Sequence, residues 1–346
     1  MVGAELIWKS IFKEVNQEQG CCDMQEIHSM WNTEKGNQSS ITEFLLEGFG
    51  NVPELQPLLS LFFLIIYLAT VTGNLLIILL VIADHHLHTP MYFFLANLSC
   101  LETCYSSIIL PQILVNLFSG QKSISFSRCM TQFYLFGSCV GIETYLLASM
   151  SFDRYLAICK PLLYAIIMNK RLCFQLIVAT WTSSMMGNGI LMCLMAQLSF
   201  CGPNIIDHYF CDFFPMAKLS CSDTKLLELV TFILTFPFTI APFLLTLISY
   251  FCIIENILKI SSTTEKRKVF SNCSSHLMVI GIFYSTVIIV YMLPNIPILR
   301  QLNKVFSVFY TVLTPLINPL IYSLRNKEVH KAFKRLGCKM IHFKDF

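Results

Sequence analysis

The stretch LQPLLSLFFLIIYLATVTGNLLIILLVIA, residues 55–83, decides the fold class of this 346-residue chain, because it contains no Asp, Glu, Lys or Arg. About 20 mostly apolar residues in a helix cross the hydrocarbon core of a bilayer, which is about 30 Å thick. Four further stretches also lack Asp, Glu, Lys and Arg: residues 172–206, 229–254, 269–299 and 305–324. Two more contain one carboxylate each, Glu102 in residues 89–121 and Glu143 in residues 129–152. The sequence therefore predicts seven membrane spans.

The spans are expected to be helices, because backbone groups in lipid must form hydrogen bonds within the protein. None alternates apolar and polar residues as barrel strands do. We predict an all-α membrane protein with an extracellular tail (1–54), a seven-helix domain (55–324) and a cytoplasmic amphipathic helix and tail (325–346). The predicted spans cover about residues 57–83, 91–115, 127–158, 172–195, 228–258, 268–293 and 304–324.

Composition and charge exclude several classes of protein. Charged residues make up only 13% of the chain and hydrophobic residues 55%, unlike a disordered chain or an ordinary cytosolic enzyme. The net charge of +3 is small for a nucleic-acid-binding domain, so no nucleic-acid partner is expected.

The basic residues predict the orientation. Most of the 24 Lys and Arg lie in the connections after the third and fifth predicted spans and in the tail after the seventh. Because positively charged loops stay in the cytoplasm, the N-terminus is expected outside and the C-terminus inside. Asn37 is then an extracellular glycosylation acceptor, since Asn37-Gln38-Ser39 forms the required triplet.

Four cysteines are predicted on the outer side: Cys129, Cys201, Cys211 and Cys221. Disulfides form in that oxidising environment, and four cysteines allow three pairings. No cysteines show zinc-ribbon spacing, so a metal site built from cysteines is not expected.

Five ordered motifs identify the family that this chain resembles. They are LHTPMYFFL (87–95), MSFDRYLAIC (150–159), Ser249-Tyr250, KVFSNCSSHL (268–277) and PLINPLIY (315–322). Together they resemble those of olfactory receptors of the tetrapod-type class, within the rhodopsin-like G-protein-coupled receptor family. The match runs from about residue 42 to residue 336.

The first residues of the chain depart from the family pattern. The N-terminal tail is longer than is usual in the family, and starting at Met30 would give a typical length. Residues 1–29 are therefore a candidate upstream extension.

The resemblance implies function and partners. It predicts a receptor, not an enzyme, that binds a small, mostly apolar, neutral volatile ligand and activates a stimulatory, olfactory-type G protein to raise cAMP. The plasma membrane of olfactory cilia is the expected location, with membrane lipids and trafficking chaperones as further candidate partners. The alternatives are a non-olfactory rhodopsin-like receptor for a small metabolite and, more distantly, a membrane transporter. Against the transporter, the two halves show no internal repeat.

Residues at the inner ends of the helices are expected to switch on activation. Arg154 should face the bundle and pair locally, with Asp153 as the candidate partner, because a lone arginine in lipid is costly. The resemblance implies that Arg154 changes contacts together with the other predicted coupling residues: Asp153, Tyr155, Tyr250, His276, Asn318, Pro319 and Tyr322. The simpler alternative is that Arg154 only extends to the lipid headgroups.

Glu102 and Glu143 are the only acids deep in the predicted spans, and Asn74 and Asn318 complete a candidate polar cluster. Two nearby carboxylates either hold a cation or share a proton. A structural sodium ion and a hydrogen-bonded plug without an ion remain alternatives. No other cofactor or metal is expected.

The expected ligand pocket lies in the outer half of the bundle, where residues three or four apart share a helix face. Its predicted lining, together with Thr231, is Phe136, Gly137, Val140, Gly141, Thr144, Leu234, Thr235, Phe238, Tyr284, Val287, Ile288, Tyr291, Val308 and Thr311. This lining is apolar with a few hydroxyls and no fixed charge, which favours a neutral ligand over an amine.

The resemblance also favours one disulfide pairing, Cys129 with Cys211 and Cys201 with Cys221. Beyond the seventh span, Val329, Phe333 and Leu336 form the apolar face of a predicted surface helix. The position of Cys338 after this helix makes it a candidate for palmitoylation.

Overall fold

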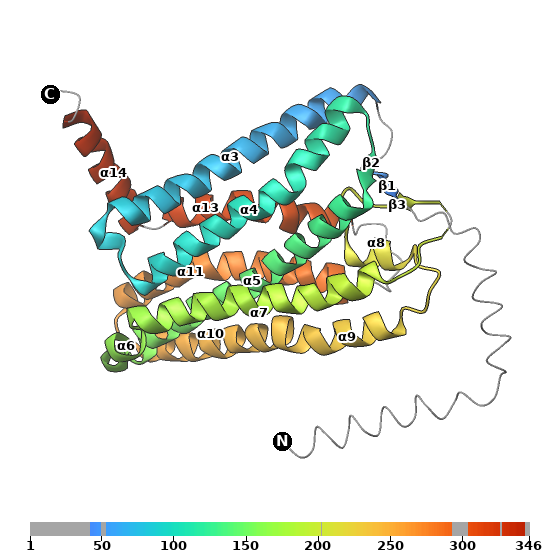
Figure 1. Cartoon of the computed structure of the whole chain (residues 1–346). Coiled ribbons are helices and arrows are strands. Elements are labelled where there is room, and N and C mark those ends of the chain that lie inside the picture. The colour runs from blue at the N-terminus through green and yellow to red at the C-terminus, as the bar shows by residue number, and fades with distance from the viewer. Residues whose placement is uncertain (1–41, 50–52, 202, 293–303, 326, 343–346) are drawn as a thin grey trace, which may run out of the picture. The chain divides into compact units, whose positions relative to one another are not determined.

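The computed structural model describes residues 42–342, apart from residues 50–52, 202, 293–303 and 326 (Figure 1). Within the helices, it does not describe the side chains of residues 265, 268, 271, 272, 292, 322–325, 327 and 336–342. The chain divides into two units, Met1–Ile41 and Thr42–Phe346, and the fold described below is that of the second.

Seven described helical segments are long and apolar enough to cross a membrane. The first four are α3 (Gln56–Ala83), α4 (Pro90–Ser119), α5 (Phe126–Cys159) and α7 (Lys170–Ala196). The fifth is continuous through α9 (Lys225–Thr235), η3 (Phe236–Ile240) and α10 (Ala241–Lys259). The sixth and seventh contain α11 (Thr263–Val287), η4 (Ile288–Met292), η5 (Phe309–Leu313) and α13 (Thr314–Arg325). The predicted seven-helix fold class is confirmed.

Burial explains why these apolar helices form a bundle. On α3 the buried residues Phe63, Ile66, Thr70, Asn74 and Ile77 recur every three or four positions, so they share one face. Large apolar side chains between them are exposed, which is the pattern of a helix with lipid on its other face. The central helix α5 is buried over most of its length and contacts α4, α7 and α10.

The fifth span departs from regular α-helix where its prolines lie. Residues 236–240 form the π-helical turn η3, which contains Pro237, and Pro242 follows in the first turn of α10. Proline lacks a backbone N–H and disrupts the regular hydrogen-bond ladder, so a change of winding at this point has a clear physical cause. Pro294 and Pro297 lie outside the described residues.

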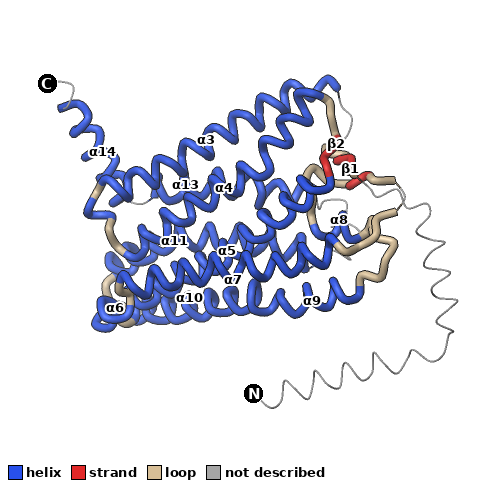
Figure 2. Tube along the Cα trace, viewed as in Figure 1, coloured by secondary structure: helices blue, strands red, loops and turns tan. Residues whose placement is uncertain are grey.

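A three-stranded sheet at the outer end was not predicted. It is formed by β1 (Glu43–Leu46), β2 (Ser123–Ser125) and β3 (Ile205–Ile206), with β1 in the centre. Strands are drawn in red in Figure 2. β1 pairs antiparallel with β2 and parallel with β3. Phe44 and Leu46 on β1 are fully buried, whereas Leu45 is exposed, so the sheet covers the bundle with one face.

Both expected disulfides are present on the outer side. Cys129–Cys211 links the start of α5 to the second outer loop and closes a loop of 82 residues, while Cys201–Cys221 closes one of 20 residues within that loop. Closing such loops removes roughly 4.5 and 3 kcal/mol of unfolded-state entropy, respectively. Lys304 forms an ion pair with Asp207 in the second outer loop. Its Nζ also donates to the Gly48 carbonyl, just after β1, at 3.3 Å.

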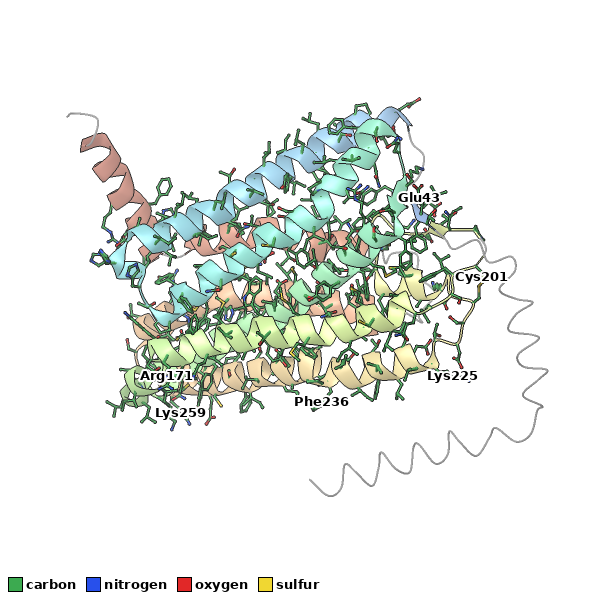
Figure 3. The ribbon with its side chains drawn as sticks, in the orientation of Figure 1. Glu43, Arg171, Cys201, Lys225, Phe236 and Lys259 are labelled. Carbon is green, nitrogen blue, oxygen red and sulfur yellow. A yellow bond between two sulfur atoms is a disulfide. The ribbon has the colours of Figure 1, made fainter. Side chains whose placement is uncertain are left out.

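The inner end is the one that the basic residues predict to face the cytoplasm. Figure 3 shows Arg171 and Lys259 there, whereas Glu43, Cys201 and Lys225 lie at the opposite end of the bundle. The inner connections include η2 (His85–Leu87) and α6 (Pro161–Ile167), and α14 (Lys327–His342) follows α13.

The inner end of α3 and α14 are joined by an ion pair. The Asp84 carboxylate, which is buried, accepts from Arg335 Nε at 2.8 Å and lies 2.6 Å from its Nη2. Burial opposes ionisation of Asp84, but hydrogen bonds from His86 and Arg335 outweigh it and hold the pKa of this carboxyl well below its usual range. Within α14, Val329 is buried and Phe333 is exposed; the side chains of Leu336 and Cys338 lie outside the described part of the chain.

Candidate functional site: a cavity beneath the second outer loop

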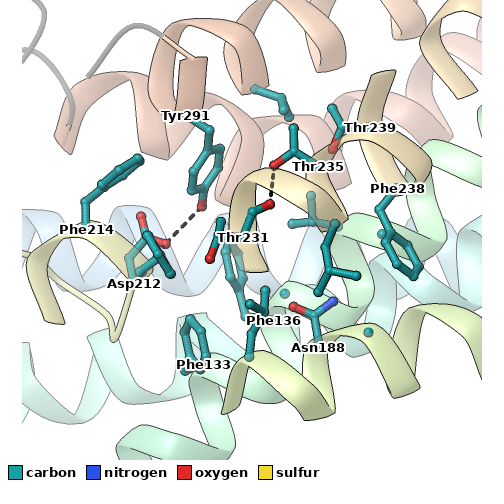
Figure 4. Close-up of a pocket in the computed structure, with 18 residues that line it drawn as sticks. Phe133, Phe136, Asn188, Asp212, Phe214, Thr231, Thr235, Phe238, Thr239 and Tyr291 are labelled. Carbon is teal, nitrogen blue, oxygen red and sulfur yellow. Dashed lines mark hydrogen bonds between the residues drawn. The ribbon is translucent and has the colours of Figure 1, made fainter. Parts of the chain in front are cut away.

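A cavity of about 190 Å³ lies in the outer half of the bundle. Its walls come from α5, α7, α9, η3 and the outer part of the sixth span, and the second outer loop contributes residues next to Cys211 (Figure 4). The lining residues are Phe133, Phe136, Gly137, Val140, Gly141, Gly187, Asn188, Leu191, Asp212, Phe213, Phe214, Thr231, Leu234, Thr235, Phe238, Thr239, Val287 and Tyr291. Apolar walls with a few polar groups are typical of small-molecule sites.

Glycines allow the walls of the cavity to approach one another. A Cβ on Gly187 would lie 2.7 Å from the ring of Phe238, and a Cβ on Gly141 would lie 3.1 Å from Ser184 Oγ. A Cβ on Gly137 would overlap the side chain of Asn188. Each contact is closer than side-chain carbons normally permit, so α5, α7 and η3 pack at this distance because these positions lack side chains.

The structure brings together most, but not all, of the predicted lining. The predicted residues that line the cavity are Phe136, Gly137, Val140, Gly141, Thr231, Leu234, Thr235, Phe238, Val287 and Tyr291. The predicted residues that do not line it are Thr144, Tyr284, Ile288, Val308 and Thr311.

Hydrogen bonds between segments explain why three of these five residues do not line the cavity. The Thr144 hydroxyl donates to the Phe238 carbonyl at 2.7 Å, and the Tyr284 hydroxyl lies 3.4 Å from the Thr144 carbonyl. The hydroxyls of Thr311 and Tyr209 are 2.8 Å apart. These side chains join neighbouring segments and do not face the cavity.

The prediction that the lining carries no fixed charge was wrong, because Asp212 lines the cavity. Asp212 belongs to the second outer loop and caps the short helix α8 (Phe213–Ala217) by accepting from the Phe213 N–H at 2.8 Å. Its Oδ1 also accepts from the Tyr291 hydroxyl at 3.0 Å. Burial raises the pKa of Asp212 to about 6, although both hydrogen bonds favour the ionised form.

The second group of predicted polar residues lies deeper in the bundle. Glu102 on α4 and Glu143 on α5 are both buried, and Asn318 Nδ2 donates to Glu102 Oε1. Asn74 does not bond to either carboxylate; its Nδ2 donates to the Thr70 and Pro315 carbonyls at 3.0 and 3.1 Å. Asn74 therefore joins α3 to α13.

These carboxylates fit a cation or a shared proton. Glu102 Oε2 and Glu143 Oε1 are buried and have no hydrogen-bond partner among the described residues. An uncompensated buried carboxylate is costly, and either a bound cation or protonation removes the cost. The sodium site stays a proposal.

The comparisons with known proteins place the chain in a family. The profile described as "Olfactory receptor" matches residues 63–340. The chain belongs to the olfactory receptor family. Mouse "Olfactory receptor 5AP2" is 46% identical over 300 residues, covering 87% of this chain and 95% of the relative. Human "Olfactory receptor 6B1" is 46% identical over 304 residues, covering 87% and 96%.

The fold of the receptor is that of rhodopsin. Squid rhodopsin, a solved structure, superposes with a TM-score of 0.61 at 17% identity, covering 84% of this chain and 87% of the rhodopsin chain. The protein is thus an olfactory G-protein-coupled receptor with several membrane spans, and its family consists of receptors, not enzymes.

At the inner end of the olfactory receptor, Asp153 and Arg154 form no ion pair within the described residues. The expected ion pair was wrong. The buried Asp153 carboxylate accepts from the Tyr164 hydroxyl of α6 at 2.9 Å, and Arg154 is near enough only for its charge to act on it. Arg154 Nε is buried and has no hydrogen-bond partner in the part of the chain that the structure describes.

Tyr250 and His276 do lie together. The Tyr250 hydroxyl on α10 is 2.6 Å from His276 Nδ1 on α11, and Arg154 is near enough for its charge to act on both. Asn318 and Pro319 lie within α13, and Tyr155 packs against the core. The side chain of Tyr322, and all of Asn37, lie outside the described residues.

Proposed function

We propose that this receptor binds a small, mostly apolar, neutral volatile ligand in the cavity beneath the second outer loop. The observation that carries the proposal is the cavity itself, with its aromatic and aliphatic walls and few polar groups. Its position between α5, α7 and the fifth and sixth spans also supports a role in activation, because a ligand there contacts four helices at once.

We further propose that the ligand signal reaches a stimulatory, olfactory-type G protein through the inner ends of α5, α10 and α11, and that the receptor acts in olfactory cilia. Arg154, Tyr250 and His276 support this part of the proposal, because they gather at the inner ends of three different helices. The buried Arg154 Nε–H donates to none of the described residues, so it is poised to take a new acceptor when the helices separate.

A cAMP reporter screen tests the proposal. Cells that express the full chain and the stimulatory olfactory-type G protein are exposed to a broad panel of odorants, with surface density measured in parallel. We expect at least one odorant to raise cAMP, and Arg154→Ala to reduce that response at least tenfold at equal surface density.

The matched control is Arg171→Ala, which removes an exposed arginine at the inner start of α7 and should signal normally. A normal response by the Arg154 variant would contradict the proposed route. An odorant response that depends on a different G protein would overturn only the choice of G protein.

A further inference from the structure

We propose that the ligand of this cavity is a neutral hydrogen-bond donor, a small alcohol or phenol whose hydroxyl donates to Asp212 Oδ2. The proposal rests on the proposed function, in which the cavity is the odorant site, and it names the head group that the odorant must carry.

The first observation is a buried acceptor without a donor on a residue that lines the apolar cavity. Asp212 is only 2% exposed and lines the cavity, and Figure 4 shows it beside Tyr291. Its Oδ1 accepts two hydrogen bonds, from Phe213 N and from Tyr291. Its Oδ2 is buried and accepts none from the described residues. A buried acceptor without a donor is costly, so a donor placed there gains more than it would in water.

The second observation is that, among the described residues, the hydroxyl groups near this acceptor already donate to other partners. Because the Tyr291 hydroxyl donates to Asp212, the Tyr310 hydroxyl, 2.9 Å away, must donate to Tyr291. The hydroxyls of Thr231 and Thr235 donate to the carbonyls of Leu227 and Thr231, at 2.7 and 2.8 Å.

Each of these hydroxyls has one proton, so their remaining capacity is to accept. On the side of the lining away from Asp212 in Figure 4, the Thr239 hydroxyl forms no hydrogen bond with the described residues, and Asn188 Nδ2 donates only one of its two protons, to the Ser184 carbonyl at 3.2 Å. Donors therefore remain on that side. Near Asp212 the cavity therefore offers acceptors, and a ligand with only acceptor groups leaves Oδ2 unsatisfied.

The third observation concerns the body of the ligand. Phe133, Phe136 and Phe214 give the cavity aromatic walls, and its volume is about 190 Å³. An apolar cavity of about 150 Å³ holds a benzene molecule, so one aromatic ring with a short substituent is the right size.

A neutral hydroxyl fits better than an ammonium group. A cationic ligand would have to leave water completely, and the desolvation of a buried ion costs several kcal/mol. A hydroxyl has a much smaller desolvation cost and still forms a charge-assisted bond with an ionised carboxylate. With the pKa of Asp212 near 6, this carboxylate is mostly ionised at neutral pH.

Isomeric probes separate the effect of the head group from the effect of ligand size. Benzyl alcohol, p-cresol and anisole have the same atoms, but only the first two carry a hydroxyl; toluene lacks the oxygen and benzylamine carries a cation. A second pair, 1-hexanol and methyl pentyl ether, repeats the comparison on an aliphatic chain. Two readouts apply to the full-length receptor: cAMP in cells, and the melting temperature of the purified protein with each probe.

We expect the hydroxyl probes to act at concentrations at least tenfold lower than their ether isomers in both readouts. Asp212→Asn keeps the size and the helix-capping ability of the side chain but replaces one acceptor with a donor. The variant should reduce the difference between alcohol and ether to less than threefold. The control Asp223→Asn removes an exposed carboxylate from the same loop and should leave the preference unchanged.

Several outcomes would overturn the inference while the proposed function stands. They are an ether as potent as its isomeric alcohol, a preference for alcohol that survives Asp212→Asn, or a response to benzylamine alone. Failure of the proposed function looks different: no odorant with any head group would raise cAMP or the melting temperature, and the inference would fall with it.

Discussion

At the scale of single residues, His208 links receptor stability to pH. It is 2% exposed, and neither ring nitrogen has a hydrogen-bond partner among the described residues. The rings of Tyr209 and Phe210 lie 4.6 Å from its ring. Burial, and secondarily the charge of Lys304, lower the pKa of His208 to about 3, while Asp207 opposes the shift.

We predict that His208→Phe makes the receptor less sensitive to acid. The unfolded chain takes up a proton on this histidine below pH 6.5, whereas the folded chain resists protonation until pH falls to about 3. Stability is therefore lost as pH falls through this window, and at pH 5.5 the loss is about 1.4 kcal/mol. Melting temperatures of the purified receptor at pH 7.5 and 5.5 measure it.

Asp212 acts in the opposite direction in this experiment. Its raised pKa means that acidification below about 6 relieves the cost of a buried charge until the unfolded carboxyl also takes up a proton. Both proteins contain Asp212, so the difference between them isolates His208. An equal fall in melting temperature in both would contradict the prediction.

Asp212 also shows what sequence reasoning missed at this scale. The predicted lining was built from positions three or four apart on helices, and a loop residue has no such period. A usable signal was nevertheless present: the expected Cys129–Cys211 disulfide ties the neighbour of Asp212 to the outer start of α5. The pairing of Asp153 with Tyr164 was missed for a related reason, because it depends on how α6 folds back.

At the scale of elements, we predict that Gly187→Ala changes which ligands the receptor accepts. The new methyl group would lie 2.7 Å from the Phe238 ring, so the ring or the helix must move, and Phe238 lines the cavity. We expect at least a tenfold loss of potency for the largest active odorants, with less effect on the smallest. Dose–response curves for a homologous odorant series measure this change.

Gly189→Ala is the matched control for that change. It lies on the same helix, but its Cβ would meet only Tyr134, at 3.8 Å, which is an ordinary contact. Each Gly→Ala substitution should favour the helix by about 1 kcal/mol, so a difference in odorant potency between the two variants comes from packing. Identical odorant profiles for the two variants would contradict the role given to Gly187.

Long apolar elements were predictable and short ones were not. Residues 55–83 predict α3 almost residue for residue, because spanning the bilayer requires this length and composition. β2 and β3 have three and two residues, which is too short for a period of two to appear. The α7 side of the cavity was also missed, because Gly187 and Asn188 lie in a helix whose sequence is apolar on most faces.

At the scale of the whole molecule, Phe44 should stabilise the entire outer end. It is fully buried, and its ring centroid lies 5.9 Å from that of Phe126 and 5.4 Å from that of Phe200. These three rings come from the N-terminal segment, the start of α5 and the second outer loop. Phe44→Ala should cost about 3–5 kcal/mol, as truncation of a buried phenylalanine usually does.

Surface density and the melting temperature of the purified receptor check this prediction. Leu45→Ala is the control, because the neighbouring side chain on β1 is 39% exposed and should cost less than 1 kcal/mol. If the two variants lose stability equally, the sheet does not hold the outer end together in the way described.

The central position of β1 has a consequence for how the receptor is made in the cell. Its partners are far away in sequence: Glu43 accepts a hydrogen bond from Asn204, 161 residues later in the chain. At ribosomal speeds of about 5–20 residues per second, β1 waits on the order of 8–30 seconds in the endoplasmic reticulum before β3 is synthesised. Even after β2 is made, the strand edge of β1 that pairs with β3 stays open to chaperones and to other nascent chains. Export from this compartment should therefore be limited by completion of the second outer loop.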